Sequence, residues 1–278
     1  MWPRAEWLYF NRGTARLEQK QFEAAEQDFD AVLELQPNSS SALINRALAR
    51  FGARRFEGAI ADLDAAERFE KAPTRLYFIR SRVKQAAGDA AGAQADLSEG
   101  LRRQPTDDAS WVARGLARLS RDPQGAMNDF DAALALNPAC RAALEDKAHV
   151  LSERLDQIEE SVACLDRAIE LYPDYAMAWA GRGVLKARQG SYDEARADAR
   201  KALGLDTSPG IVYQVSGIFA RCAAESPADR AQALKLLGRA LRDGFGLNLV
   251  DRDPEWAGLR TDEEYVRIVE AARTLGSR

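Results

Sequence analysis

The sequence contains few of the residues that catalytic and metal sites usually require. It has one histidine, His149, and three cysteines, which lie far apart and form no CxxC pair: Cys140, Cys164 and Cys222. Metal sites and Ser/His or Cys/His catalysis need clusters of such side chains, and one histidine cannot supply them. No GxxxxGK[ST] phosphate-binding motif occurs either. We therefore expect no enzyme activity, no cofactor and no metal site, with His149 as a solvated or ligand-contacting residue.

Long apolar runs and an excess of basic charge are also missing. The most apolar tract, 210–224, is interrupted by Gln214 and Arg221, and a membrane-spanning helix needs roughly 18 apolar residues without a break. The N-terminus has no apolar core of signal-peptide length. A net charge of −4 argues against nucleic acid or an anionic membrane as the partner. Widely spaced cysteines of odd number predict free thiols in a reducing compartment, so we expect a cytoplasmic protein.

A repeat of about 34 residues dominates what is present. A basic residue recurs at steps of 33 to 35 residues, at Arg12, Arg46, Arg80, Arg114, Lys147 and Arg182. The repeat predicts six units, at 6–39, 40–73, 74–107, 108–140, 141–175 and 176–209. A period of this length with two helical patterns is typical of stacked helical hairpins.

Each unit follows the same pattern of large and small residues. In the first expected helix, a large residue precedes a small one by four positions, as in Tyr9 and Gly13 or Trp111 and Gly115. The second helix carries a small residue at Ala25, Ala59, Ala93, Ala126, Ser161 and Ala195. The units close at Pro37, Pro73, Pro105, Pro138, Pro173 and Pro209. Small residues at matching places let two helices approach closely, and proline ends a helix.

This combination resembles the tetratricopeptide repeat, over about residues 6–209. The resemblance implies an all-α, right-handed superhelical solenoid of helix-turn-helix hairpins. In this family the first helix of each pair lines a concave groove, which usually binds extended peptides or partner helices.

The remaining sequence continues the pattern and then closes it. Residues 210–243 look like a degenerate seventh pair, and 244–278 like a C-terminal helical capping segment. Thr261 and Glu264 form a capping-box pattern that predicts the start of a last helix. The large apolar residues of this segment are expected to seal the core: Trp256, Leu259 and Tyr265.

Charged residues also recur within the units. A second basic residue recurs in the first helix at Arg16, Arg50, Lys84, Arg118 and Lys186. An aspartate recurs in the second helix at Asp28, Asp62, Asp96, Asp129 and Asp198. The fifth unit has lost both charges, with Leu151 and Cys164 in their places. The shared loss indicates an ion pair that joins the two helices of a unit; a phosphate-binding ladder of basic residues is the alternative.

The resemblance also places a set of residues on the concave surface. They are Phe10, Thr14, Ile44, Leu48, Arg75, Phe78, Arg82, Val112, Leu116, Glu145 and His149. If the apolar members are exposed, a partly apolar and acidic peptide is the natural ligand. The alternative is that these apolar residues form the core between repeats.

The sequence therefore predicts a non-catalytic scaffold that binds a partner segment in its groove. The alternative is a regulatory or substrate-recruiting arm of a larger bacterial enzyme, such as a serine/threonine protein kinase. Its basis is the tail, which resembles those closing such arrays, and a start that runs directly into a repeat. An RNA-binding helical array is a third possibility, which the acidic balance disfavours. The partner's identity and the oligomeric state are not predicted.

Overall fold

The computed structural model describes residues 5–69 and 72–276, and every regular element in these ranges is helical. The chain divides into two compact units, residues 1–140 and 141–278. Residues 1–4, 70–71 and 277–278 lie outside the described ranges. The expected all-α fold of consecutive helical hairpins is confirmed within each unit.

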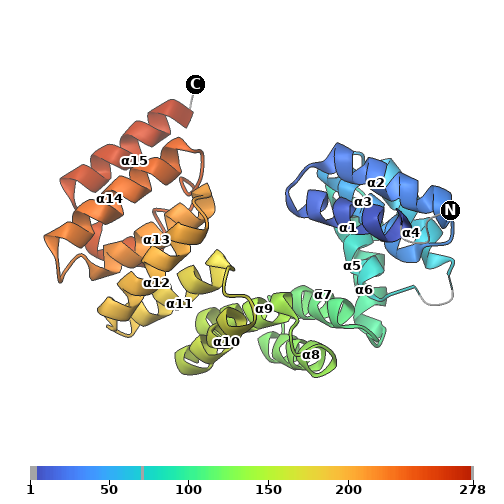
Figure 1. Ribbon diagram of the computed structural model, residues 1–278, viewed down its shortest axis with the longest axis horizontal. Helices are drawn as coiled ribbons and strands as arrows, with labels where there is room; N and C mark the ends of the chain where they lie inside the picture. Colours follow the sequence, from blue (N-terminus) through green and yellow to red (C-terminus); the bar gives the residue numbers. More distant parts are fainter. Residues whose placement is uncertain (1–4, 70–71, 277–278) are drawn as a thin grey trace. The chain divides into compact units, whose positions relative to one another are not determined.

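The first unit consists of four helix pairs (Figure 1). Their bounds are α1 (Ala5–Glu18), α2 (Phe22–Leu35), α3 (Ser40–Gly52), α4 (Phe56–Glu67), α5 (Arg75–Ala86), α6 (Ala90–Arg102), α7 (Asp108–Arg118) and α8 (Pro123–Leu136). Each first helix packs on its own second helix, and α3 and α5 pack in turn on the second helices before them, α2 and α4. The chain thus stacks pair upon pair.

The second unit continues with further pairs and the tail (Figure 1). Its elements are α9 (Arg141–Arg154), α10 (Ile158–Leu171), α11 (Ala176–Arg188), α12 (Tyr192–Leu205), α13 (Pro209–Cys222), α14 (Pro227–Arg242), the 3-10 helix η1 (Pro254–Leu259) and α15 (Glu263–Gly276). Helix η1 packs on α13, and α15 packs on α14. The tail is therefore part of this unit's core.

Small residues allow the close approach of paired helices, as the sequence predicts. A Cβ atom added at Gly115 in α7 would lie 2.6 Å from the ring of Phe130 in α8. One added at Gly13 would lie 3.0 Å from Phe29. Both contacts are closer than carbon atoms normally tolerate, so a larger residue would push the helices apart.

The repeated aspartates are buried, and each forms an ion pair with a basic residue of the first helix of its own unit. The nitrogen-to-oxygen distances are 2.8 Å for Arg16–Asp28, Arg50–Asp62 and Lys84–Asp96, 3.0 Å for Arg118–Asp129 and 3.7 Å for Lys186–Asp198. The predicted ion pairs within the units are confirmed. Because these basic groups face carboxylates of their own unit, they do not form the alternative phosphate-binding ladder.

The first basic series has a role that the sequence did not reveal. Arg46 donates from Nε and Nη2 to Asp62 in its own pair, at 2.9 and 2.6 Å. Its Nη1 donates at 2.7 Å to Asp30 in α2, the second helix of the preceding pair. Arg80 likewise joins Asp96 in its own pair to Asp64 in α4. One guanidinium therefore joins three helices. It connects neighbouring units as well as the two helices of one pair.

The fifth unit joins its helices without a buried aspartate. Ser161 in α10 donates its hydroxyl to the carbonyl oxygen of Ala148 in α9, at 2.7 Å, and both residues are buried. Leu151, which replaces the second basic residue, is also buried. A neutral hydrogen bond and apolar packing thus occupy the place of the ion pair.

The tail seals the core as expected, but its last helix begins differently. Trp256 is fully buried, and Tyr265 is nearly so, with the two rings 5.5 Å apart. The predicted capping box at Thr261 is wrong. Asp262 Oδ1 accepts hydrogen bonds from the backbone N–H groups of Glu264 and Tyr265, and Thr261 is exposed. The aspartate is the better acceptor at a helix N-terminus, because its negative charge also favours that end of the helix dipole.

Replacing Asp62 should test the buried cluster. Asp62→Ala removes the buried carboxylate that Arg46 and Arg50 share and leaves each only its partner on α2, Asp30 or Glu26. We therefore expect a loss of about 2–4 kcal/mol in the free energy of unfolding. The loss should be smaller when Arg50→Ala is already present. Urea unfolding of the single and double variants measures both quantities.

Asp64→Ala is the matched control, because Asp64 also pairs with an arginine but is half-exposed. We expect it to cost less than about 1 kcal/mol. Equal losses for Asp62→Ala and Asp64→Ala, or strict additivity with Arg50→Ala, would contradict the proposed importance of burial.

Candidate functional site

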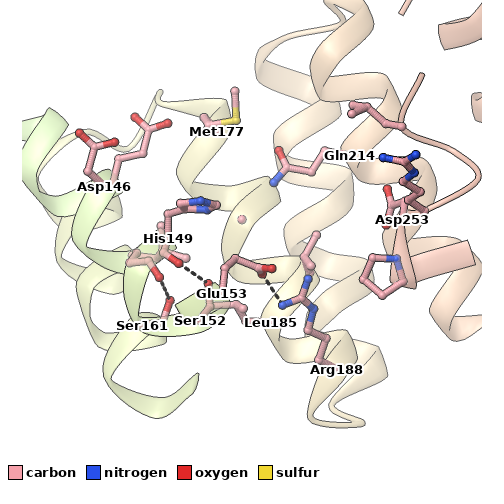
Figure 2. A pocket seen from close by; sticks show the side chains of 18 of the residues that line it. Asp146, His149, Ser152, Glu153, Ser161, Met177, Leu185, Arg188, Gln214 and Asp253 are labelled. Carbon is pink, nitrogen blue, oxygen red and sulfur yellow. Dashed lines mark hydrogen bonds and ion pairs between the residues drawn. The ribbon is translucent and has the colours of Figure 1, made fainter. Parts of the chain in front are cut away.

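A pocket of about 760 Å³ opens in the second unit (Figure 2). The first helices of three consecutive pairs contribute to it: α9, α11 and α13. Ser161 and Leu165 of α10 add to one wall, and the segment 248–254 closes another. The tail therefore completes a pocket that the helix pairs alone would leave open.

The lining combines exposed apolar side chains with charged and amide groups. Met177 and Leu249 are large apolar residues that remain exposed. Figure 2 shows the His149 ring and the Gln214 amide directed toward each other from α9 and α13. The charged residues are Glu145, Asp146, Glu153, Asp253, Arg188 and Arg252. Such a surface offers apolar contact and hydrogen bonds to a ligand.

Two adjacent carboxylates lie on α9. Burial, with the neighbouring charge of Glu145, raises the pKa of Asp146 to about 6. Glu145 accepts a hydrogen bond from the Tyr175 hydroxyl, and burial and this bond raise the pKa of Tyr175. Asp146 has no comparable donor among the described residues. Near neutral pH, the negative charge on Asp146 therefore costs more free energy than the charge on Glu145.

Arg188 holds the tail against the rest of the pocket. Its Nη1 pairs at 2.6 Å with Glu153 of α9, as Figure 2 shows, and its Nε pairs at 2.8 Å with Glu255 of η1. Glu255 is buried and also meets Arg221 of α13 at 3.1 Å. Burial raises the pKa of Glu255, and the two arginines oppose that rise. This cluster connects α9, α11, α13 and the tail.

A second contact fixes the segment that closes the pocket. The hydroxyl of Tyr213 donates to Asp253 at 2.8 Å. The preceding turn brings the backbone of Gly246 against the Tyr213 ring, where an added Cβ would lie 2.3 Å away. Gly246 also has φ +95, which glycine adopts most readily. The position of the closing segment thus depends on packing around one tyrosine.

The predicted groove residues fall into three groups. Ile44, Phe78 and Val112 are buried, so the alternative of an inter-repeat core describes these three. Thr14, Leu48, Arg75 and Phe10 are half-buried, and Phe10 packs edge-on against Phe29. The exposed members are Leu116, His149 and Arg82, whose guanidinium lies 5.8 Å from the centre of the Phe51 ring.

Of the predicted residues, the pocket brings together Glu145 and His149 only. The sequence analysis missed Met177, Gln214 and the segment 248–254. Met177 occupies the same place in its unit as Arg75, and Gln214 the same place as Phe10. Extending the register to later pairs would have found both, whereas the tail segment gives no comparable signal.

The described residues were also compared with what a metal site or a membrane span would require. Within residues 5–69 and 72–276, no three His, Cys, Asp or Glu side chains gather as a metal site would require. Every helix in the same ranges is too short or too polar to span a lipid bilayer. We take the second-unit pocket as the candidate functional site because three first helices and the tail all contribute side chains to it.

Comparison with known proteins agrees with this architecture. A sequence model of the tetratricopeptide repeat family matches residues 10–74 and 153–210. These two segments are tetratricopeptide repeats. The matched segments contain the large and small residues that pair the helices in both units. No curated protein sequence matches the chain.

Solved structures share the fold at low sequence identity. A chain of the APC/C hetero-tetramer Cut9-Hcn1 has a TM-score of 0.61 and 11% identity, over 95% of this chain and 48% of that chain. The present chain thus spans about half of its length. A tetratricopeptide repeat protein from Parabacteroides merdae has a TM-score of 0.55 and 16% identity, over 97% and 99%. At this identity the likeness concerns the tetratricopeptide fold.

Human IFIT1, solved as a dimer with PPP-AAAA, is a third example. Its TM-score is 0.59 at 16% identity, over 98% of this chain and 73% of that chain. At these identities the three structures share the fold with this chain and carry no information on a kinase. The alternative of a kinase arm therefore stays a prediction, as do the bacterial source and the cytoplasmic location.

Asp146 should make the stability of the protein depend on pH. Its folded-state pKa lies above its unfolded value, so the protonated form stabilises the fold below about pH 4. That contribution is lost as the pH rises through about 6. Asp146→Asn should remove this dependence and raise stability at pH 7 by about 1–2 kcal/mol, allowing for partial exposure.

Thermal unfolding from pH 4 to pH 8 measures the effect. Asp174→Asn, at an exposed aspartate of the same unit, serves as the control and should leave the pH profile unchanged. An Asp146→Asn profile parallel to that of the unsubstituted protein would show that Asp146 titrates normally.

Proposed function

We propose that the chain is a non-catalytic scaffold that binds a segment of a partner protein, with the second-unit pocket as its main contact. The observation that carries the proposal is the pocket's composition, exposed Met177 and Leu249 beside polar groups from three first helices. An extended segment can place apolar side chains against these residues and its backbone near the Gln214 amide.

The hydroxyl groups in the pocket support binding over catalysis. Ser152 donates to the carbonyl oxygen of His149 at 3.3 Å, and Ser161 donates to that of Ala148 at 2.7 Å. A catalytic serine needs a hydrogen bond to a base that can accept its proton. Both hydroxyls instead satisfy backbone oxygens, which is a structural role.

The charges favour a neutral or basic segment at this pocket. Four carboxylates and two guanidiniums line it, and Arg188 already pairs with Glu153 and Glu255. An acidic segment would meet net negative charge there. The acidic partner predicted from the sequence would instead belong to Arg75 and Arg82 in the first unit.

Peptide selection on the full chain tests the proposal. Random peptides displayed on phage are selected against the protein, and the best binder is synthesised and measured by fluorescence anisotropy. We expect Met177→Glu and Leu249→Glu each to weaken its binding about tenfold or more, because each removes apolar contact from the pocket. Val266→Glu is the matched control, since Val266 of α15 is 38% exposed and Met177 is 37% exposed.

Two results would contradict the proposal. One is equal affinity for the Met177→Glu, Leu249→Glu and Val266→Glu variants. The other is displacement of the peptide by a 5′-triphosphate RNA such as the one held in the IFIT1 structure, which would indicate an RNA-binding pocket despite its carboxylates.

A further inference from the structure

Helix α1 lacks the cover that the equivalent helices receive. Leu8 in α1 is 59% exposed. The residues at the same place in later units are at most 1% exposed: Ala42, Leu76, Ser110 and Ala178. These later helices pack on the second helix of the pair before them, as α3 packs on α2. The apolar surface at Leu8 is therefore built like an interface but has nothing packed on it in the described structure.

Two further places on α1 show the same difference. The Arg12 side chain is 54% exposed, whereas Arg46, Arg80, Arg114 and Arg182 are at most 18% exposed. Ala15 is exposed, whereas Ala49 at the equivalent place is fully buried in a cluster with Ala25 and Phe29 of the preceding pair. We call Leu8, Arg12, Ala15 and Arg16 the open face of α1.

The hydrogen bonds of the equivalent arginines in later units indicate which chemical group the open face can bind. Nη1 of Arg46, Arg80 and Arg182 donates to an aspartate of the preceding second helix, at 2.7, 2.7 and 2.6 Å. Arg12 bonds Asp28 through Nε and Nη2. Its Nη1 has no acceptor in the described part of the chain. The unused donor is therefore the one that binds a carboxylate of the preceding helix in Arg46, Arg80 and Arg182, and the carbonyl oxygen of Arg103 in Arg114.

A second arginine repeats the pattern one turn later. Arg50 of α3 pairs through Nε with Glu26 of α2 at 2.8 Å, beside the pair between Arg46 and Asp30. Arg16, the equivalent of Arg50, uses Nη1 for Asp28 and the Ala24 carbonyl oxygen. Its Nε has no acceptor among the described residues. Carboxylates four residues apart, as in Glu26 and Asp30, lie on one side of a helix and so reach both arginines.

We propose that the open face of α1 binds an acidic amphipathic helix of a partner protein. That helix carries two carboxylates one turn apart, which pair with Arg12 and Arg16, and small or apolar residues that cover Leu8 and Ala15. The exposed Trp7 beside Leu8 extends the apolar area. This surface lies in the first unit and is separate from the second-unit pocket.

The interface between α2 and α3 supplies the probe. It is a synthetic peptide of residues 22–35, FEAAEQDFDAVLEL, labelled with a fluorophore. A hydrocarbon cross-link between positions 31 and 35 holds it helical, because so short a helix is marginal alone. The cross-link lies away from Glu26 and Asp30 on the helix surface. Its binding to the full chain is measured by fluorescence anisotropy.

We expect saturable binding that depends on both charge and the apolar contact. The peptide with Glu26→Gln and Asp30→Asn should bind about tenfold more weakly, since it keeps the shape but loses both ion pairs. Leu8→Glu in the protein should weaken binding about tenfold or more. Leu136→Glu, at a residue of the same unit that is 57% exposed, should leave binding unchanged.

Four outcomes would overturn the proposal. They are the absence of saturable binding, equal affinity for the acidic and neutral peptides, equal affinity for Leu8→Glu and the unsubstituted protein, and a homodimer in sedimentation that Leu8→Glu dissociates. The last would assign the open face to a second copy of this chain. Circular dichroism of each variant checks that the fold is retained. We expect it to be, because Leu8 and Leu136 are both exposed.

Discussion

A buried aspartate in the second helix of five of the pairs organises much of the structure. Asp62 receives Arg46 and Arg50 from its own pair, and Arg46 extends to Asp30 of the preceding pair. A buried carboxylate is costly unless charged donors surround it. The helices must therefore keep the spacing and register that let these donors reach it. The same contacts join paired helices and successive units.

The second-unit pocket lies where that arrangement changes. The fifth unit has Cys164 in place of the aspartate, and its Ser161 and neighbouring Leu165 contribute to the pocket wall. Glu255 of the tail is another buried acid. It pairs with Arg188 of α11 and Arg221 of α13. Ion pairs in this part of the chain thus also join the helices to the tail, while Asp198 of α12 keeps its pairs with α11. The contact with the tail shapes the pocket, because it holds the segment that closes it.

The sequence predicted the helix pairs and their ion pairs because both depend on nearby residues at constant spacing. The sequence did not predict which residues of the expected groove are exposed. Ile44 and Phe78 occupy equivalent places and are both buried, whereas Gln214 at the same place lines the pocket. Whether such a side chain is open to solvent depends on the volumes of its neighbours in other pairs. A repeat register does not contain that information.

The sequence by itself determined the two helices of each unit, the small residues between them and the aspartate that joins them, because these features repeat every 33 to 35 residues. Tertiary structure alone decided which arginine reaches a third helix and where a pocket remains. Arg188 meets Glu255 across 67 residues of sequence. Such a contact depends on the packing of the tail on α13, which brings the two charges together.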